Sequence, residues 1–152
     1  IWKRVDGMSA LGEDVELWLG TVVSTGPQTI TVAFSGLLTG LSVELSAQEF
    51  TANLGVSTAW TVDQANSIGM TPAGYFVGFP TLTPTNPGEL YYGYAFTQNV
   101  ALAGGTTGFT YTPTAEQKIV AYNPAVTSPT VSPTASQAPA GSYIVLGILL
   151  RA

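Results

Sequence analysis

The sequence QTITVAFS, residues Gln28–Ser35, carries an apolar side chain at every second position, namely Ile30, Val32 and Phe34. Successive side chains of a β-strand point to opposite faces, so this alternation predicts a half-buried strand. We expect this strand to lie in the middle of a β-sandwich.

The next stretch, Leu41–Ala52 (LSVELSAQEFTA), alternates in the same way up to Leu45 and then changes phase before Phe50. A β-bulge supplies a one-residue slip of this kind, and we expect a second central strand here. Glycosidases use a pair of carboxylates as acid and nucleophile, and Glu44 and Glu49 are the candidate pair in this stretch. The phase change should place them at different depths, so we expect no catalysis from them.

The rest of the chain shows further short strands separated by Gly- and Pro-rich turns. We expect a turn-rich connection over Asp6–Glu13 and a polar turn over Asp63–Ser67. The expected strands are Ile1–Val5, Asp14–Gly20, Ala59–Val62, Tyr75–Leu82, Glu89–Phe96, Phe109–Thr112, Gln117–Tyr122 and Tyr143–Leu150. Short strands at this spacing indicate an all-β, antiparallel β-sandwich of jelly-roll or Ig-like Greek-key topology.

A length of 152 residues predicts a single domain over 1–152, with a Pro/Thr-rich loop at 124–139. The most apolar run is Tyr143–Leu150 (YIVLGILL), which is far shorter than the ~20 residues needed to span a bilayer. We therefore expect no membrane insertion, and we expect this run to be a buried strand that pairs with a segment distant in sequence. Because the chain begins with Ile1, we expect a processed product or a fragment.

Charged residues are scarce in this chain. They make up 9% of it, and the net charge is −5 with only four Lys and Arg residues. Four scattered cations do not form the basic patch that nucleic-acid binding needs. A surface with so little charge is typical of a domain packed in an assembly or working outside a cell, so we expect an extracellular or virion location.

The chain has no Cys and no His. The commonest general base and the commonest metal ligand are therefore missing. The one acidic cluster, Glu13, Asp14 and Glu16, has the oxygen ligands that a calcium site needs, but it lacks the spacing of a calcium-binding loop. We interpret it as a solvated strand edge, and we expect no enzymatic activity, no cofactor and no metal.

Exposed apolar side chains are the candidate contacts with a partner. Trp18 lies opposite the apolar face of its strand, and Leu37 and Leu38 occupy a turn where leucines are unusual. All three are predicted interface residues. Trp2 and Trp60 are expected in the core.

Two tyrosines in aromatic strands complete the candidate contacts. Tyr75 opens an aromatic strand and is a candidate for stacking on a sugar ring or for anchoring a protein partner. In Glu89–Phe96 we expect the face of Leu90 to be the core, which leaves Tyr91 on the surface as a contact.

Three stretches of the sequence, ELWLGTVVSTGPQTITVAFSG, LSVELSAQEF and GSYIVLGILLRA, together resemble the β-sandwich modules of phage virion proteins and bacterial surface proteins. The resemblance covers Asp14–Phe50 and the last dozen residues. It implies a structural or adhesive role and assigns no functional residue.

Composition and resemblance together predict a non-enzymatic structural or interaction domain of an extracellular assembly. Its most specific form is a phage virion component, such as a fibre, receptor-binding or decoration protein, that forms a homo-oligomer or contacts neighbouring virion or surface subunits. One alternative is a carbohydrate-binding module that recognises a cell-surface glycan. Another is a subunit of a bacterial or archaeal surface filament, in which a terminal strand completes a neighbour's sheet.

Overall fold

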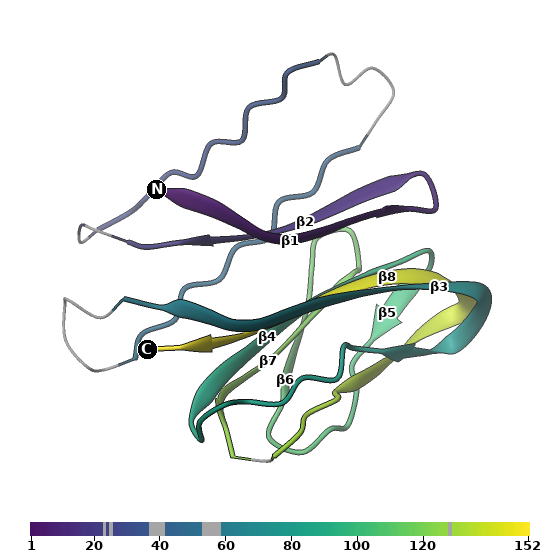
Figure 1. The fold of residues 1–152 in the computed structure, drawn as a ribbon. Helices are drawn as coiled ribbons and strands as arrows, with labels where there is room; N and C mark the ends of the chain where they lie inside the picture. The colour runs from purple at the N-terminus through teal and green to yellow at the C-terminus, as the bar shows by residue number, and fades with distance from the viewer. Residues whose placement is uncertain (23, 25, 37–41, 53–58, 128) are drawn as a thin grey trace.

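The computed structural model is all-β, and the described part of the chain contains no helix (Figure 1). The described residues are 1–22, 24, 26–36, 42–52, 59–127 and 129–152. Their strands are β1 (Trp2–Ala10), β2 (Glu13–Gly20), β3 (Thr61–Gly78), β4 (Glu89–Thr97), β5 (Val100–Leu102), β6 (Thr110–Pro113), β7 (Ile119–Val126) and β8 (Thr134–Arg151).

The strands form two antiparallel sheets. One is the two-stranded hairpin β1–β2, and the other has six strands in the order β3-β8-β4-β7-β6, with β5 paired to β8. The predicted all-β, antiparallel class is therefore confirmed. So is the distant pairing of the terminal strand, because β8 pairs with both β3 and β4.

The long strands β3 and β8 bend back together, so that one sheet supplies two layers (Figure 1). The second half of β8 pairs with β4, whereas residues 134–138 of β8 pair with β5 and with the end of β3. Buried Gln137 holds the bend, since its Nε2 donates to the carbonyl oxygen of Gly74 at 3.0 Å and to that of Gly141. Gly141 is required here, because a Cβ at this position would lie 2.8 Å from Gln137 Oε1.

Both faces of β8 are buried. Tyr143, Val145 and Leu149 pack in one core, between the main part of the sheet and its bent-back part. The even-numbered side chains Ile144, Leu146, Ile148 and Leu150 pack in a second core, under the β1–β2 hairpin. A strand covered on both sides needs apolar residues at consecutive positions, which explains the uninterrupted run YIVLGILL.

The β1–β2 hairpin covers the second core with one face. Val15 and Leu17 are buried, as the alternation in β2 predicted, and Met8 of β1 packs over Gly69 of β3. The expected turn-rich connection over Asp6–Glu13 is wrong, because β1 continues to Ala10 and only two residues turn the chain.

The expectation that Trp2 is buried is also wrong. Its side chain is half exposed and lies across Gly20, the residue paired with it on β2. An edge hairpin has its core contacts on one side only, so an aromatic ring near its end can rest on the neighbouring strand instead of entering the core.

The prediction that Gln28–Ser35 and Leu41–Ala52 are the central strands is wrong. Their described residues belong to neither sheet, and they run as separate extended traces beside the hairpin (Figure 1). The central positions go to β8 and β4, which are apolar on both faces. Gln28–Ser35 has an apolar pattern on one face only, so it cannot fill a place that is buried on two sides.

Two other boundaries differ from the expectations. Residues 63–67 continue β3 and do not form a turn, and the predicted loop at 124–139 is shorter, because β7 extends to Val126 and β8 begins at Thr134. In both segments the long partner strand supplies hydrogen bonds that override the local preference of polar or Pro-rich sequence.

The predicted surface position of Tyr91 is wrong as well. Tyr91 is 0% exposed, and its hydroxyl donates to the carbonyl oxygen of Pro80 at 2.9 Å. Leu90 is buried too, on the opposite face. Both faces of β4 are buried because the strand lies between two cores, so neither side of it is free for a surface contact.

Two paired glycines make room for the aromatic part of the first core. Gly93 of β4 lies opposite Gly147 of β8, and the ring of Phe79 occupies the space beside Gly93. A Cβ at Gly147 would lie 2.7 Å from the Tyr91 hydroxyl and 3.3 Å from Pro80. The missing side chains thus allow the Tyr91–Pro80 hydrogen bond to form inside the core.

We predict that Gly147→Ala lowers the free energy of unfolding by about 1–3 kcal/mol, because the added methyl group overpacks the core at Tyr91. Gly105→Ala is the matched control, since a Cβ there meets no atom within 4 Å. Urea unfolding of both variants measures the difference. Equal stability of the two would contradict this packing.

Candidate functional site

The described residues Gln28–Ser35, hereafter the arm, extend along the molecule without a sheet partner. No backbone–backbone hydrogen bond joins them to another described segment. Val32 and Phe34 are 51% and 50% exposed, and Ile30 is half-buried. The arm therefore has the side-chain pattern of a strand, while its backbone donors and acceptors lack the ladder that a strand normally makes.

A groove of about 410 Å³ lies between the arm and the body of the molecule. One wall is formed by arm residues 30–34, and the facing walls by residues 16–19 of β2 and by residues 45–48. The side chains of Tyr92, Ile148 and Leu150 contribute from β4 and β8, together with Phe50. The groove thus reaches from the surface down to the face of the main sheet.

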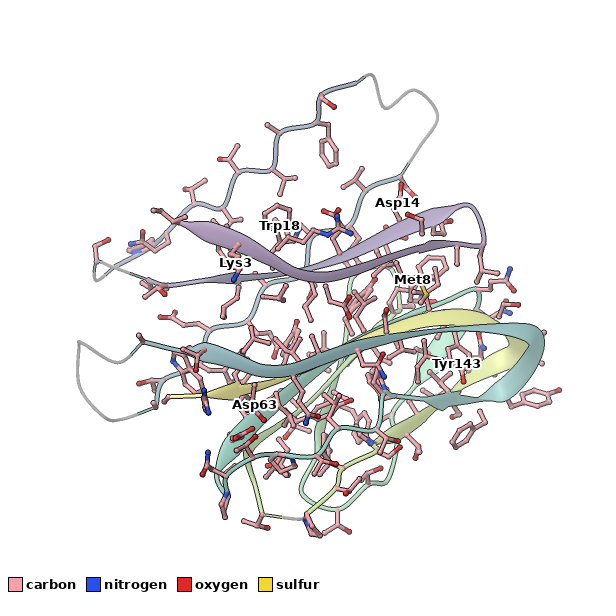
Figure 2. The ribbon with its side chains drawn as sticks, viewed as in Figure 1. Lys3, Met8, Asp14, Trp18, Asp63 and Tyr143 are labelled. Atoms are coloured by element: carbon pink, nitrogen blue, oxygen red, sulfur yellow. The ribbon has the colours of Figure 1, made fainter. Side chains whose placement is uncertain are left out.

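Trp18 is the large aromatic side chain that β2 places beside this groove (Figure 2). It is 48% exposed, and its Nε1 donates to Glu16 Oε2 at 3.0 Å. Glu16 in turn forms an ion pair with Arg4 of β1 at 3.2 Å. This chain of contacts holds the indole ring in place on the outer face of the hairpin.

The segment Ser42–Ala52 is attached to the sheet, in contrast to the arm. Glu44 Oε2 accepts a hydrogen bond from the Tyr94 hydroxyl at 3.0 Å, and Glu44 Oε1 accepts one from the backbone N–H of Glu116 at 3.0 Å. Phe50 packs edge-on against Tyr122, with the ring centroids 5.2 Å apart. Glu44 is half-buried and Glu49 is exposed, so the two carboxylates do lie at different depths.

The tyrosines next to this attachment have raised pKa values. Burial raises the pKa of Tyr92 to about 12. Burial raises the pKa of Tyr94 still further, and the negative charge of Glu44 adds to the effect because it disfavours a tyrosinate beside it. Both hydroxyls are therefore protonated at neutral pH, and Tyr94 acts as a donor to Glu44.

A second exposed apolar patch lies where β3 bends. Tyr75 is 67% exposed and Phe76 is 61% exposed. Phe76 pairs with Ser136 of β8, and Ser136 also pairs with Leu102 of β5. Phe76, Ser136 and Leu102 therefore form one row across the outer face of the bent-back layer. Leu102 and its neighbour Val100 are exposed as well.

The structure separates the predicted contact residues. Trp18 and Tyr75 are both exposed, but Trp18 lines the groove and Tyr75 does not. Leu37 and Leu38 lie outside the described residues.

The sequence reasoning missed Val32 and Phe34 of the arm as surface residues. No charged residue occurs between Glu16 and Glu44, and this lack of charge is typical of a buried strand, so the local sequence carries no signal that these two side chains are exposed.

Among the described residues, no group of three or more acidic side chains lies close enough together to hold a metal ion. In the same part of the chain, no helix has the length and hydropathy that crossing a membrane requires.

No protein-family model matches this sequence, and no similar protein was found among curated sequences or solved structures. The features of the molecule that bear on its function are therefore the arm, the groove and the exposed aromatic side chains.

We predict that Glu44→Gln lowers the pKa of Tyr94, because the carboxylate charge that disfavours the tyrosinate is removed. The pKa stays above its ordinary value of 10.0, because burial remains its main cause. Spectrophotometric titration measures the change, with Tyr94→Phe identifying the step that belongs to Tyr94.

Hydrogen exchange at the Glu116 amide should also accelerate in Glu44→Gln, because this amide donates to the Glu44 carboxylate. Glu49→Gln is the matched control, since it makes the same change of charge at an exposed position on the same segment. An identical response of the two variants would contradict the role of Glu44 as the attachment point.

Proposed function

We propose that this chain is a non-enzymatic structural domain that assembles with other subunits outside the cell. The observation that carries the proposal is the arm: an extended, apolar and uncharged segment whose backbone has no sheet partner among the described residues. Such a segment is a template for pairing with another chain. The low charge of the whole sequence agrees with a surface that is covered in an assembly.

The exposed apolar side chains support the same function. Among the described residues, thirteen large apolar side chains are exposed, and nine of them precede residue 46, in the part of the chain that holds β1, β2 and the arm. Aromatic side chains such as Trp18 supply much of the binding energy in interfaces. One end of the molecule is therefore the candidate contact surface.

A phage virion component, such as a fibre, receptor-binding or decoration protein, is the most specific form of this proposal. The resemblance of Asp14–Phe50 and of the terminal strand to virion and surface modules supports it. We also assign the layers to a β-sandwich of jelly-roll or Greek-key kind. This assignment rests on the two packed layers of the bent sheet and on the long sequence separation between β8 and its partners β3 and β4.

We predict that the purified protein is an oligomer in solution, and that Trp18→Ala weakens its self-association by about tenfold or more, as loss of a central aromatic contact does. Light scattering over a concentration series measures both effects. Tyr75→Ala is the control, because Tyr75 is exposed at a distance from the groove, and it should leave the association unchanged. A wild-type protein that stays monomeric at all concentrations would contradict an assembly of identical copies.

A carbohydrate-binding module is the second candidate function. It is favoured by two consecutive exposed aromatics near the end of β3, Tyr75 and Phe76, of which Phe76 lies on the outer face of the bent-back layer. Aromatic rings at such positions can stack on the apolar faces of sugar rings.

If this second function holds, cell-surface polysaccharides should bind to the protein, and Tyr75→Ala should weaken the binding by about tenfold or more, as at other aromatic contacts. Trp18→Ala should leave it unchanged. Isothermal titration calorimetry with a polysaccharide panel provides the test. Binding lost in Trp18→Ala and kept in Tyr75→Ala would exclude the Tyr75 patch as the glycan site.

A further inference from the structure

We infer that the partner of the arm is the same arm of a second copy, paired antiparallel about a twofold axis at Val32. This inference rests on the proposed assembly function and names its partner and its mode of contact. It is carried by three features of the described residues. The backbone of the arm has no sheet partner among them, the arm carries no charge, and one antiparallel register places each apolar residue of the arm opposite an apolar residue of the second arm.

The first feature is the unmatched backbone of the arm. Residues 29–34, TITVAF, combine high β-propensity with no charge and no proline. A segment of this kind left exposed on an edge promotes aggregation, and proteins cover it or protect it. The strands of the hairpin have such protection, with Lys3 and Arg4 on β1 and Glu13, Asp14 and Glu16 on β2. The arm has none, so it is suited to be covered by another strand.

The second feature is the lack of charge in the arm, which favours a second copy of this protein as the chain that pairs with it. Each copy carries a net charge of −5, which opposes self-association at most surfaces. The arm lies inside the uncharged stretch between Glu16 and Glu44, so two arms can meet without placing like charges opposite each other. Pairing through the arms therefore adds no close contact between like charges.

The third feature is the register. Residues directly opposite each other in an antiparallel pair share a face. With Val32 opposite its own copy, Ile30 lies opposite Phe34, and Thr31 lies opposite Ala33. Every apolar side chain then meets an apolar one, and the other face keeps its small and hydroxyl side chains together. A shift of the partner strand by one residue would place the apolar face of one arm against the other face of its partner.

The surroundings of the arm supply further contact area. A stable interface of standard size buries about 1,600 Å² in total, and a pair of short strands needs additional contacts to reach it. Several side chains next to the arm in sequence or across the groove are about half exposed. They are Trp2, Trp18, Val22, Val43 and Leu45. A twofold contact uses each of these surfaces twice and closes after two copies.

Cysteine substitution tests this register directly, because the chain contains no cysteine of its own. In an antiparallel pair the Cα atoms of opposite residues are about 4.5–5.5 Å apart, within the range of a disulfide. Val32→Cys should therefore form a covalent dimer under mild oxidation by oxidised glutathione. Thr31→Cys alone should not, because its own copy lies diagonally, at about 7–8 Å.

A mixed sample provides the matched control. Thr31→Cys and Ala33→Cys oxidised separately should remain single chains, whereas the mixture should form the heterodimer, because these two positions oppose each other. Non-reducing electrophoresis separates the products, and native mass spectrometry of the unmodified protein reports the number of copies.

The outcomes separate this inference from the proposed function. A dimer with the predicted crosslinks supports both. An oligomer in which Val32→Cys stays uncrosslinked, or a trimer, overturns the twofold arm pairing and leaves the assembly function standing. A monomer overturns both, and a monomer that retains a small apolar molecule assigns the groove to a ligand.

Discussion

The burial of β8 on both faces is the constraint on which the rest of the structure depends. Tyr143, Val145 and Leu149 enter one core and Ile144, Leu146 and Ile148 enter the other. Two covers are therefore needed. The chain makes one by bending β3 and β8 back over their own sheet and the other by laying the β1–β2 hairpin across the opposite face.

The two covers differ in how completely they are built. The bent-back layer is continuous with the sheet, and its bend is fixed by Gln137 and by the absence of side chains at Gly141. The hairpin cover is narrow, because it has only two strands. The groove beside β2 lies where this cover ends, and it reaches Tyr92 and Leu150 of the second core.

The arm and the segment that follows it have different relations to this incomplete cover. Glu44 and Phe50 attach Ser42–Ala52 to the sheet through Tyr94, Tyr122 and the Glu116 amide. The arm has apolar side chains and an extended backbone, but its backbone makes no such attachment to another described segment. A second arm laid beside it would supply the missing backbone partners and would cover part of the groove. The proposed assembly surface therefore lies where the two-stranded hairpin leaves the second core incompletely covered.

The sequence by itself determined the all-β class, the inward face of β2, the existence of β4 and the buried terminal strand, because these features depend on local periodicity and on apolar composition. It also indicated that Trp18 and Tyr75 face outward, and both are exposed. Only the tertiary structure decided that Tyr91 is in a core and that Gln28–Ser35 lies outside both sheets. Periodicity reports how many faces a strand can bury, but not which strand occupies the centre. That choice depends on the competition among all strands for two-sided burial, which β8 and β4 win because they are apolar on both faces.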